Sequence, residues 1–286
     1  MPNSVEVAPP VKPFDPSTAI QYALLVQKAY AVPPAQTVYH PGDTINVSYD
    51  AINVNYEVVM TFYGNDLATD INPDRALAIV SFGFIAQDAA GAAVVAIRGT
   101  EGIKEWLQDA KFLTVKCPFL AGAGQTEDGF TAVYESLRVT QDPNSTRLVK
   151  ALLTAFPRPV TSLTICGHSL GGALATLLAL DVGANTSLGH GLNAITYASP
   201  RTGDPSFADT YNQVVPNENR IANRLDLVPK LPLPPLYEHV LGIQELNPML
   251  KVKLDLLCQH HMTTYLHLLS LETGGTVLPL DQGCVF

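Results

Sequence analysis

A single serine stands between glycines at the point where one apolar segment ends and another begins. Residues 164–172 read TICGHSLGG, so Ser169 has Gly167 two residues before it and Gly171 two residues after it. This is the G-x-S-x-G pattern, in which small residues leave room for a strained turn that presents the serine hydroxyl as a nucleophile. The alternative is an ordinary Gly-Ser turn. A β-rich segment before the turn and a helical segment after it favour the nucleophile.

A serine hydroxyl becomes a strong nucleophile only when a base takes its proton and a carboxylate orients that base. For a serine on a strand–turn–helix, the expected chain order is serine, then acid, then histidine. Among the acids after Ser169, Asp226 stands out because it follows the stretch NRIANRL (219–225) of a predicted strand and comes shortly before Val-Pro, toward the carboxyl end of that strand. Its alternative role is a loop cap or a surface acid, which is common for aspartate.

The candidates for the base are the histidines that follow the acid. They are His239, His260, His261 and His267. His267 lies on a helical stretch among leucines, where packing is the simpler role, and His239 is expected to pack near the pocket. His260 and His261 both lie in the loop before an apolar helix, and only geometry can separate them.

The elements around these residues alternate between strand and helix. Predicted strands cover residues 56–64, 76–87, 92–100, 160–166, 192–199 and 219–229. Predicted helices cover residues 17–31, 128–139, 145–156, 170–183 and 205–215, the first with Ser17 as its N-cap and the fourth ending at Gly183. This order implies an α/β fold, with hairpin-like early strands and then a mostly parallel sheet that helices cover on both faces. Functional groups gather at the carboxyl ends of the strands in such sheets.

Length and charge restrict the class of protein. The 286 residues favour a single domain over 1–286, with residues 1–16 as an extended, Pro-rich N-terminal segment. A net charge of −9 without a Lys/Arg cluster argues against a nucleic-acid partner. No apolar stretch is long enough to predict a transmembrane segment. The N-terminus lacks a basic region followed by an apolar core, so no secretory signal is predicted in this chain.

Cysteines and histidines give little indication of a metal or a redox centre. Cys258 and Cys284 flank the C-terminal segment and can pair, whereas Cys166 in an apolar strand is expected to be a buried small hydrophobic residue. The histidines lack H-E-x-x-H or comparable ligand spacing, so no metal is predicted. The chemistry described above needs no cofactor.

Several separated motifs together resemble one family. They are VVAIRGT (94–100), EWLQDAKF (105–112), GF (129–130), GHSLGG (167–172), YASPRTGDPSFAD (197–209) and RLDLVPKLP (224–232). In this order, between about residue 50 and about residue 270, they resemble the class 3 lipases, the fungal triacylglycerol-lipase-like branch of the α/β-hydrolases. The resemblance implies that Asp226 is the triad acid, through D-x-V-P, and favours His260 over His261 as the base, through H-x-M-x-x-Y. It also favours a secreted protein.

The oxyanion hole needs two donors. One is the amide of Leu170, because it lies at the N-terminus of the helix that follows the serine. The resemblance makes Thr100 the second donor, through its amide, whereas its alternative role is to cap the next helix. We further hypothesise that Asp109 accepts a hydrogen bond from the Thr100 hydroxyl and orients it.

The segment 101–113 resembles the lid of the family. Ile103, Trp106 and Leu107 fall on one face at helical spacing, opposite charged and polar residues. An amphipathic helix over an apolar pocket can open at a lipid–water interface. The alternative is a permanently closed helix whose tryptophan fills a core.

These residues together predict a serine carboxylester hydrolase with the α/β-hydrolase fold and a short helical lid. A lipase that acts on triacylglycerols or other hydrophobic acyl esters through an acyl-enzyme is the favoured function. One alternative is an esterase for soluble or aromatic esters of the feruloyl type. The other alternative is a non-catalytic lipid-binding relative, which the presence of candidates for nucleophile, acid, base and oxyanion donors argues against.

Overall fold

The computed structural model describes most of the chain. It covers residues 14–30, 38–66, 79–100, 102, 112–247 and 252–285. The predicted lid residues Ile103, Trp106 and Leu107 lie outside the described residues, and so does Asp109. Residues 1–13, which make up most of the predicted extended N-terminal segment, lie outside them as well.

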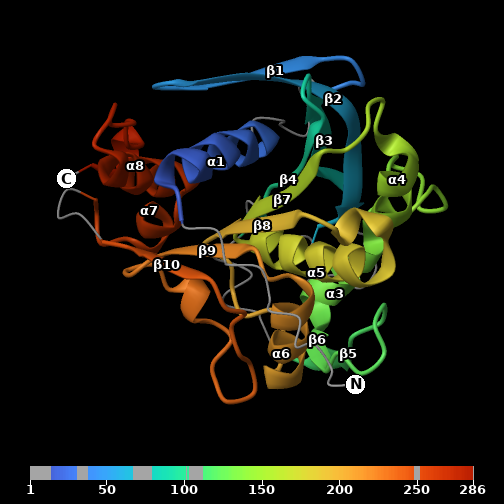
Figure 1. The fold of residues 1–286 in the computed structure, drawn as a ribbon. Helices are drawn as coiled ribbons and strands as arrows, with labels where there is room; N and C mark the ends of the chain where they lie inside the picture. The colour runs from blue at the N-terminus through green and yellow to red at the C-terminus, as the bar shows by residue number, and fades with distance from the viewer. Residues whose placement is uncertain are drawn as a thin grey trace, which may run out of the picture.

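An eight-stranded sheet forms the centre of the molecule, in the order β1-β2-β3-β4-β7-β8-β9-β10 (Figure 1). Its strands are β1 (Thr44–Tyr49), β2 (Ile52–Asn65), β3 (Ile79–Asp88), β4 (Ala92–Ile97), β7 (Ser162–His168), β8 (Leu192–Tyr197), β9 (Glu218–Asn223) and β10 (Ile243–Leu246). Neighbours from β1 to β4 pair antiparallel, and neighbours from β4 to β10 pair parallel. Early antiparallel strands followed by a mostly parallel sheet are what the sequence predicts. A separate hairpin consists of β5 (Thr114–Lys116) and β6 (Gln125–Glu127).

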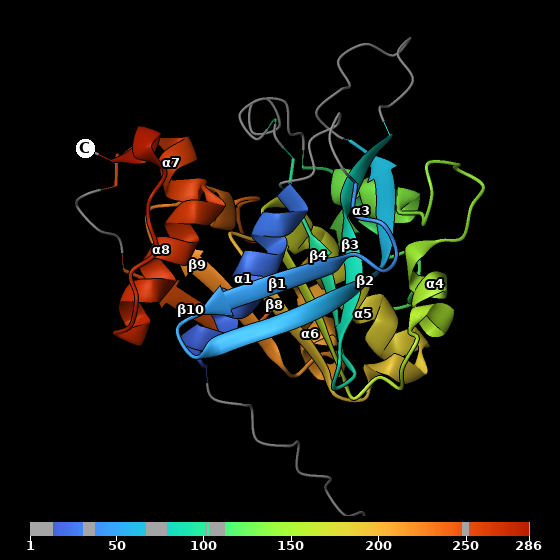
Figure 2. The same ribbon diagram turned by 90° about the horizontal axis from the view of Figure 1, so that it is seen from above.

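Helices cover both faces of this sheet (Figures 1 and 2). One face packs against α1 (Pro16–Tyr30) and α8 (Met262–Thr273), next to the short α7 (Leu256–His260). The other face packs against α3 (Asp128–Ser136), α4 (Leu148–Ala155), α5 (Leu170–Asn185) and α6 (Pro205–Val214). The predicted α/β fold is therefore confirmed.

Alternation along the strands builds two separate cores. In β4, Val94 and Ala96 point into the core under α1 and α8, while Val95 and Ile97 point into the core under α5. Successive residues of a strand face opposite sides of the sheet, and helices cover both sides, so all four side chains are buried. The central strands read as continuous apolar runs for this reason.

Helix α5 runs two residues beyond the predicted end. The sequence predicts that Gly183 ends the helix, but this glycine lies inside it, and the helix ends at Asn185. A Cβ atom at Gly183 would lie 2.7 Å from a side-chain carbon of Val214 in α6. The glycine therefore allows two helices to pack closely and does not terminate either of them.

Helix α1 begins one residue earlier than predicted, and its cap is different. Pro16 is its first residue, where a missing N–H costs nothing. The carboxylate of Asp15 accepts hydrogen bonds from the backbone N–H groups of Ser17 and Thr18, both at 3.1 Å. Asp15, and not Ser17, therefore caps the helix.

Candidate active site

Ser169 lies on a sharp turn between β7 and α5. Its backbone has φ of 60° and ψ of −127°, a left-handed conformation that is strained for a residue with a side chain. A Cβ atom at Gly167 would lie 2.0 Å from the carbonyl oxygen of Gly171, and one at Gly171 would lie 2.4 Å from that of Ile97. Both glycines are therefore needed for the turn to pack, as the motif predicts.

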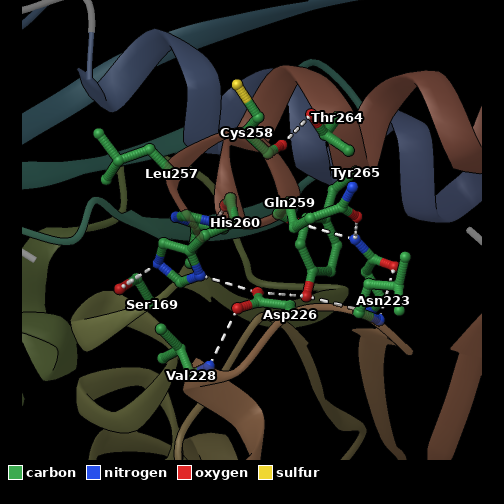
Figure 3. A network of polar contacts seen from close by, with 12 residues as sticks. Ser169, Asn223, Asp226, Val228, Leu257, Cys258, Gln259, His260, Thr264 and Tyr265 are labelled. Atoms are coloured by element: carbon green, nitrogen blue, oxygen red, sulfur yellow. Dashed lines mark hydrogen bonds and ion pairs between the residues drawn. The ribbon is translucent and has the colours of Figure 1, made fainter. Parts of the chain in front are cut away.

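Ser169, His260 and Asp226 form a continuous hydrogen-bonded chain (Figure 3). The Ser169 Oγ lies 2.8 Å from His260 Nε2, and His260 Nδ1 lies 2.8 Å from Asp226 Oδ2. Because the carboxylate accepts the proton on Nδ1, the neutral imidazole leaves its Nε2 lone pair free to accept the serine proton. This is the geometry that nucleophilic catalysis by serine requires.

The carboxylate of Asp226 is fully buried and has further donors besides His260. The Val228 N–H donates to Oδ1 at 3.0 Å, and the Tyr265 hydroxyl donates to Oδ2 at 2.8 Å (Figure 3). Burial, with the nearby Asp226 charge, raises the pKa of Tyr265 well above its usual value, so this hydroxyl keeps its proton. Asp226 lies in the turn after β9, three residues beyond the end of that strand, so the predicted strand 219–229 is too long.

The other candidate histidines do not approach Ser169. His261 is exposed, and its Nδ1 lies 3.5 Å from the Thr263 hydroxyl. His239 donates from Nε2 to the carbonyl oxygen of Pro229, and His267 donates from Nδ1 to that of Leu278. The structure thus places His260 at the serine and His261 facing away, a choice that the sequence left to geometry.

The loop after β4 lies directly against the serine. A Cβ atom at Gly99 would lie 2.9 Å from the Ser169 Cβ, so only a glycine allows this approach. Thr100 follows in the same loop and is buried. Leu170 is the first residue of α5, where N–H groups have no partner within the helix and the helix dipole is positive. Of the two predicted oxyanion donors, Leu170 therefore follows Ser169 directly, and Thr100 follows the glycine that lies against Ser169.

The side chain of Thr100 has a partner that the sequence did not predict. Its hydroxyl donates to Asp66 Oδ1 at 3.2 Å and accepts a hydrogen bond from the Gly102 N–H at 3.1 Å. Asp66 comes directly after β2, which runs parallel to β4 because β3 lies antiparallel between them. The feature of the sequence that could have identified Asp66 is its position at the carboxyl end of a strand. The predicted role of Asp109 falls outside the described residues.

A cavity of about 370 Å³ lies beside the base. Its described walls come from the end of α1, the loop after β4 and the segment around His260, namely Gln27, Tyr30, Thr100, His168, Leu257, His260, His261, Met262 and Thr263. A second cavity, of about 290 Å³, lies under α1 at the opposite edge of the sheet, and none of Ser169, Asp226 and His260 lines it. The first cavity is thus the one that a substrate of this site can occupy.

The described part of the chain contains neither a candidate metal site nor a membrane-spanning helix. Its His, Cys, Asp and Glu residues form no group of three or more that could hold a metal ion. None of its helices is both long and apolar enough to cross a membrane.

Comparison with known proteins shows the family to which the chain belongs. The sequence model of the lipase (class 3) family matches residues 94–235, which include Thr100, Ser169 and Asp226. The chain belongs to the class 3 lipase family. Among similar proteins, rice (Oryza sativa subsp. japonica) phospholipase A1-II 4 is 31% identical over 219 residues, 66% of this chain and 54% of that protein. The secreted mono- and diacylglycerol lipase 1 of Fusarium solani is 33% identical over 139 residues, 49% of this chain and 39% of that protein.

Solved structures of lipases have the same fold. The Lip2 lipase of Yarrowia lipolytica superimposes with a TM-score of 0.60 at 21% identity, covering 85% of this chain and 82% of that one. This class 3 lipase chain therefore has the α/β-hydrolase fold. It spans about half the length of the curated rice relatives that it matches.

Proposed function

We propose that this protein is a serine carboxylester hydrolase of the lipase type, which cleaves acyl esters of lipids through an acyl-enzyme. The observation that carries the proposal is the hydrogen-bonded chain from Ser169 through His260 to Asp226. Membership of the class 3 lipase family supports the same reaction class.

In the proposed mechanism, the Ser169 Oγ attacks the ester carbonyl carbon while His260 Nε2 takes the serine proton. Asp226 stabilises the imidazolium and keeps its proton on Nδ1. The amides of Thr100 and Leu170 donate to the oxyanion of the tetrahedral intermediate. His260 then gives its proton to the leaving alcohol oxygen, the C–O bond breaks, and the acyl group stays on Ser169.

Deacylation repeats these steps with water as the nucleophile. His260 takes a proton from water as the water oxygen attacks the acyl carbon, and the same amides hold the oxyanion. The Ser169 oxygen leaves and recovers the proton from His260, so the acid is released and the enzyme is regenerated. The step needs no metal or organic cofactor.

Apolar side chains near the site support a lipid as the substrate. Leu225 and Leu227 flank Asp226 and are 40% and 52% exposed, and Leu254, just before α7, is 76% exposed. Exposed leucines close to a catalytic edge suit contact with acyl chains or with a lipid–water interface. The relatives named above are a phospholipase A1 and a mono- and diacylglycerol lipase, so glycerolipid esters are the proposed substrate class.

Fluorophosphonate labelling tests the catalytic claim. The intact protein should be labelled, and Ser169→Ala should abolish labelling. An unlabelled protein, or a label on another residue, would contradict the serine mechanism and leave a lipid-binding role.

A second experiment tests the substrate class. Turnover of a chain-length series of p-nitrophenyl esters, of feruloyl esters and of emulsified triacylglycerol should favour long acyl chains and rise when the substrate forms an interface. Preference for short or feruloyl esters in solution would instead identify a soluble-ester esterase.

A further inference from the structure

His168 is a buried histidine that the proposed reaction does not use. It precedes Ser169 in the turn and is 3% exposed. Its Nδ1 lies 2.7 Å from the Tyr30 hydroxyl, and its Nε2 lies 2.8 Å from the main-chain oxygen of His260. Both nitrogens of His168 therefore have partners on other segments of the chain.

The donor and the acceptor of each hydrogen bond around His168 follow from the two backbone groups at the ends of the series, the His260 carbonyl and the Gly99 N–H. The His260 carbonyl only accepts, so His168 Nε2 carries a proton and donates it. The Gly99 N–H only donates, and it lies 2.9 Å from the Tyr30 oxygen. Burial lowers the pKa of His168 well below its usual value, with the neighbouring His260 contributing, so the ring is neutral and Nδ1 accepts. The Tyr30 hydroxyl consequently donates to Nδ1.

The resulting chain runs from the Gly99 N–H to the Tyr30 hydroxyl, through the His168 ring, to the His260 carbonyl. It connects four segments: the oxyanion loop after β4, the end of α1, the serine turn, and the segment that carries the base. Gly99 also touches this chain sterically, since a Cβ atom there would lie 2.7 Å from the Tyr30 oxygen. No other residue type allows that approach.

Aromatic packing restrains the same ring. The His168 ring lies edge-on to those of Tyr30 and Tyr265, with centroids 5.7 Å and 5.8 Å away, and its centroid is 4.7 Å from that of His260. The donor on Nε2 therefore has a fixed direction, toward the backbone of the base.

We propose that Tyr30 and His168 are positioning residues of the acyl-transfer site, which hold the Gly99–Thr100 loop in register with Ser169 and His260. The role rests on the proposed ester hydrolysis, because it concerns the placement of the oxyanion donor relative to nucleophile and base. A core histidine with a purely structural role would be expected to stabilise the fold without affecting turnover. Here the two groups at the ends of the hydrogen-bonded chain, the Gly99 N–H and the His260 carbonyl, are backbone groups of segments that carry site residues.

Half-isosteric variants separate the two contacts of His168. In His168→Asn, the amide can still accept from Tyr30 near the Nδ1 position but no longer reaches the His260 carbonyl. In His168→Gln, the amide can still donate to that carbonyl near the Nε2 position but loses the Tyr30 contact. Tyr30→Phe removes only the hydroxyl. Tyr22→Phe is the matched control, since Tyr22 is also a half-buried tyrosine of α1 but lines the second cavity with Thr164, at the opposite edge of the sheet.

The experiment measures kcat and KM for a soluble p-nitrophenyl ester, the rate of fluorophosphonate labelling, and urea unfolding of each variant. Displacement of a catalytic group by about 1 Å can cost roughly a hundred-fold in rate. Tyr30→Phe, His168→Asn and His168→Gln should therefore lower kcat and the labelling rate by about ten- to a hundred-fold, with KM within about three-fold. Tyr22→Phe should lower stability and leave kcat unchanged. In the His168→Gln background, Tyr30→Phe should have a smaller effect than in the wild type.

The outcomes separate two claims, the positioning role of Tyr30 and His168 and the proposed ester hydrolysis. A labelled wild type whose Tyr30→Phe variant turns over like Tyr22→Phe would overturn the positioning role and leave the hydrolase. A wild type that is not labelled at all would overturn both. Equal effects of Tyr30→Phe in the wild type and in His168→Gln would show that the hydroxyl does not act through His168, and would also overturn the proposal.

Discussion

Asn223 and Gln259 are joined by two buried hydrogen bonds. The Asn223 Nδ2 donates to the main-chain oxygen of Gln259 at 2.9 Å and to its Oε1 at 2.8 Å (Figure 3). The Asn223 N–H also donates to the hydroxyl of Tyr265 at 3.0 Å, and this hydroxyl donates to Asp226. Since Gln259 precedes His260, one asparagine at the end of β9 ties the base to the acid.

Replacing Asn223 should therefore affect both stability and turnover. Asn223→Ala leaves two buried oxygens of Gln259, the main-chain oxygen and Oε1, without this donor, which typically costs about 1–3 kcal/mol of unfolding free energy. We also expect kcat to fall about ten-fold, because the base loses its tie to β9. Urea unfolding and ester turnover measure the two effects. Asn223→Asp keeps the shape but loses the donor, so full activity in that variant would contradict the prediction.

Replacing Asp226 should lower turnover far more than stability. Asp226→Asn can no longer hold the proton on His260 Nδ1, so the base presents the wrong tautomer to Ser169. In a serine triad such a change lowers kcat by about 10⁴-fold. Asp204→Asn is a suitable control, because Asp204 caps α6 by accepting a hydrogen bond from the Phe207 N–H. A variant at Asp226 with turnover near that of the control would contradict its role as the acid.

The hydroxyl of Thr100 should contribute to catalysis separately from its amide. Thr100→Val removes the hydroxyl, which donates to Asp66, at nearly constant volume, and we expect kcat to fall about ten-fold or more. Thr100→Ser keeps the hydroxyl and should retain most of the activity. Steady-state kinetics distinguish the two. If Thr100→Val and Thr100→Ser behave alike, the hydroxyl and its contact with Asp66 have no catalytic role.

The disulfide between Cys258 and Cys284 should stabilise the segment that carries the base. It closes a loop over a sequence separation of 26 and holds α7, whose last residue is His260. Replacing both cysteines by serine should cost about 2–4 kcal/mol of unfolding free energy. Thermal unfolding and turnover with and without dithiothreitol check this. Cys117 and Cys166 are free thiols, so reduction of the double variant should change nothing further.

The stability of the protein should decrease as the pH is lowered, in part because of His239. Burial, with the nearby Arg220 charge, lowers the pKa of His239 to about 3. In the unfolded chain, His239 binds a proton when the pH falls below its ordinary pKa of about 6.5, whereas in the native protein it does not. The free energy of unfolding therefore decreases as the pH falls from about 6.5 toward 3, by at most about 1.4 kcal/mol per pH unit. His239→Gln can still donate to Pro229 and should have the shallower pH dependence. Identical slopes in urea unfolding between pH 4 and 8 would contradict the assignment.

Local pattern in the sequence was sufficient for the serine turn and for the order of the central strands and helices, but it did not predict β1, β5, β6 or β10. The alternation of apolar residues predicts the strands, and the glycines around Ser169 predict a turn that the structure shows to be sterically dependent on them. The boundaries were less accurate, because Gly183 packs against α6 and Asp15 reaches back to cap α1, and neither effect is visible in local periodicity.

Tertiary structure alone decided which polar side chains meet. His260 and His261 are adjacent in sequence, and only the packing of α7 against the end of β9 turns one toward Ser169 and the other toward solvent. Asp66, Asn223, Tyr30 and His168 are likewise ordinary residues in the sequence. They become neighbours of the site because a sheet with parallel strands brings the ends of distant segments to one edge, and sequence spacing does not encode those distances.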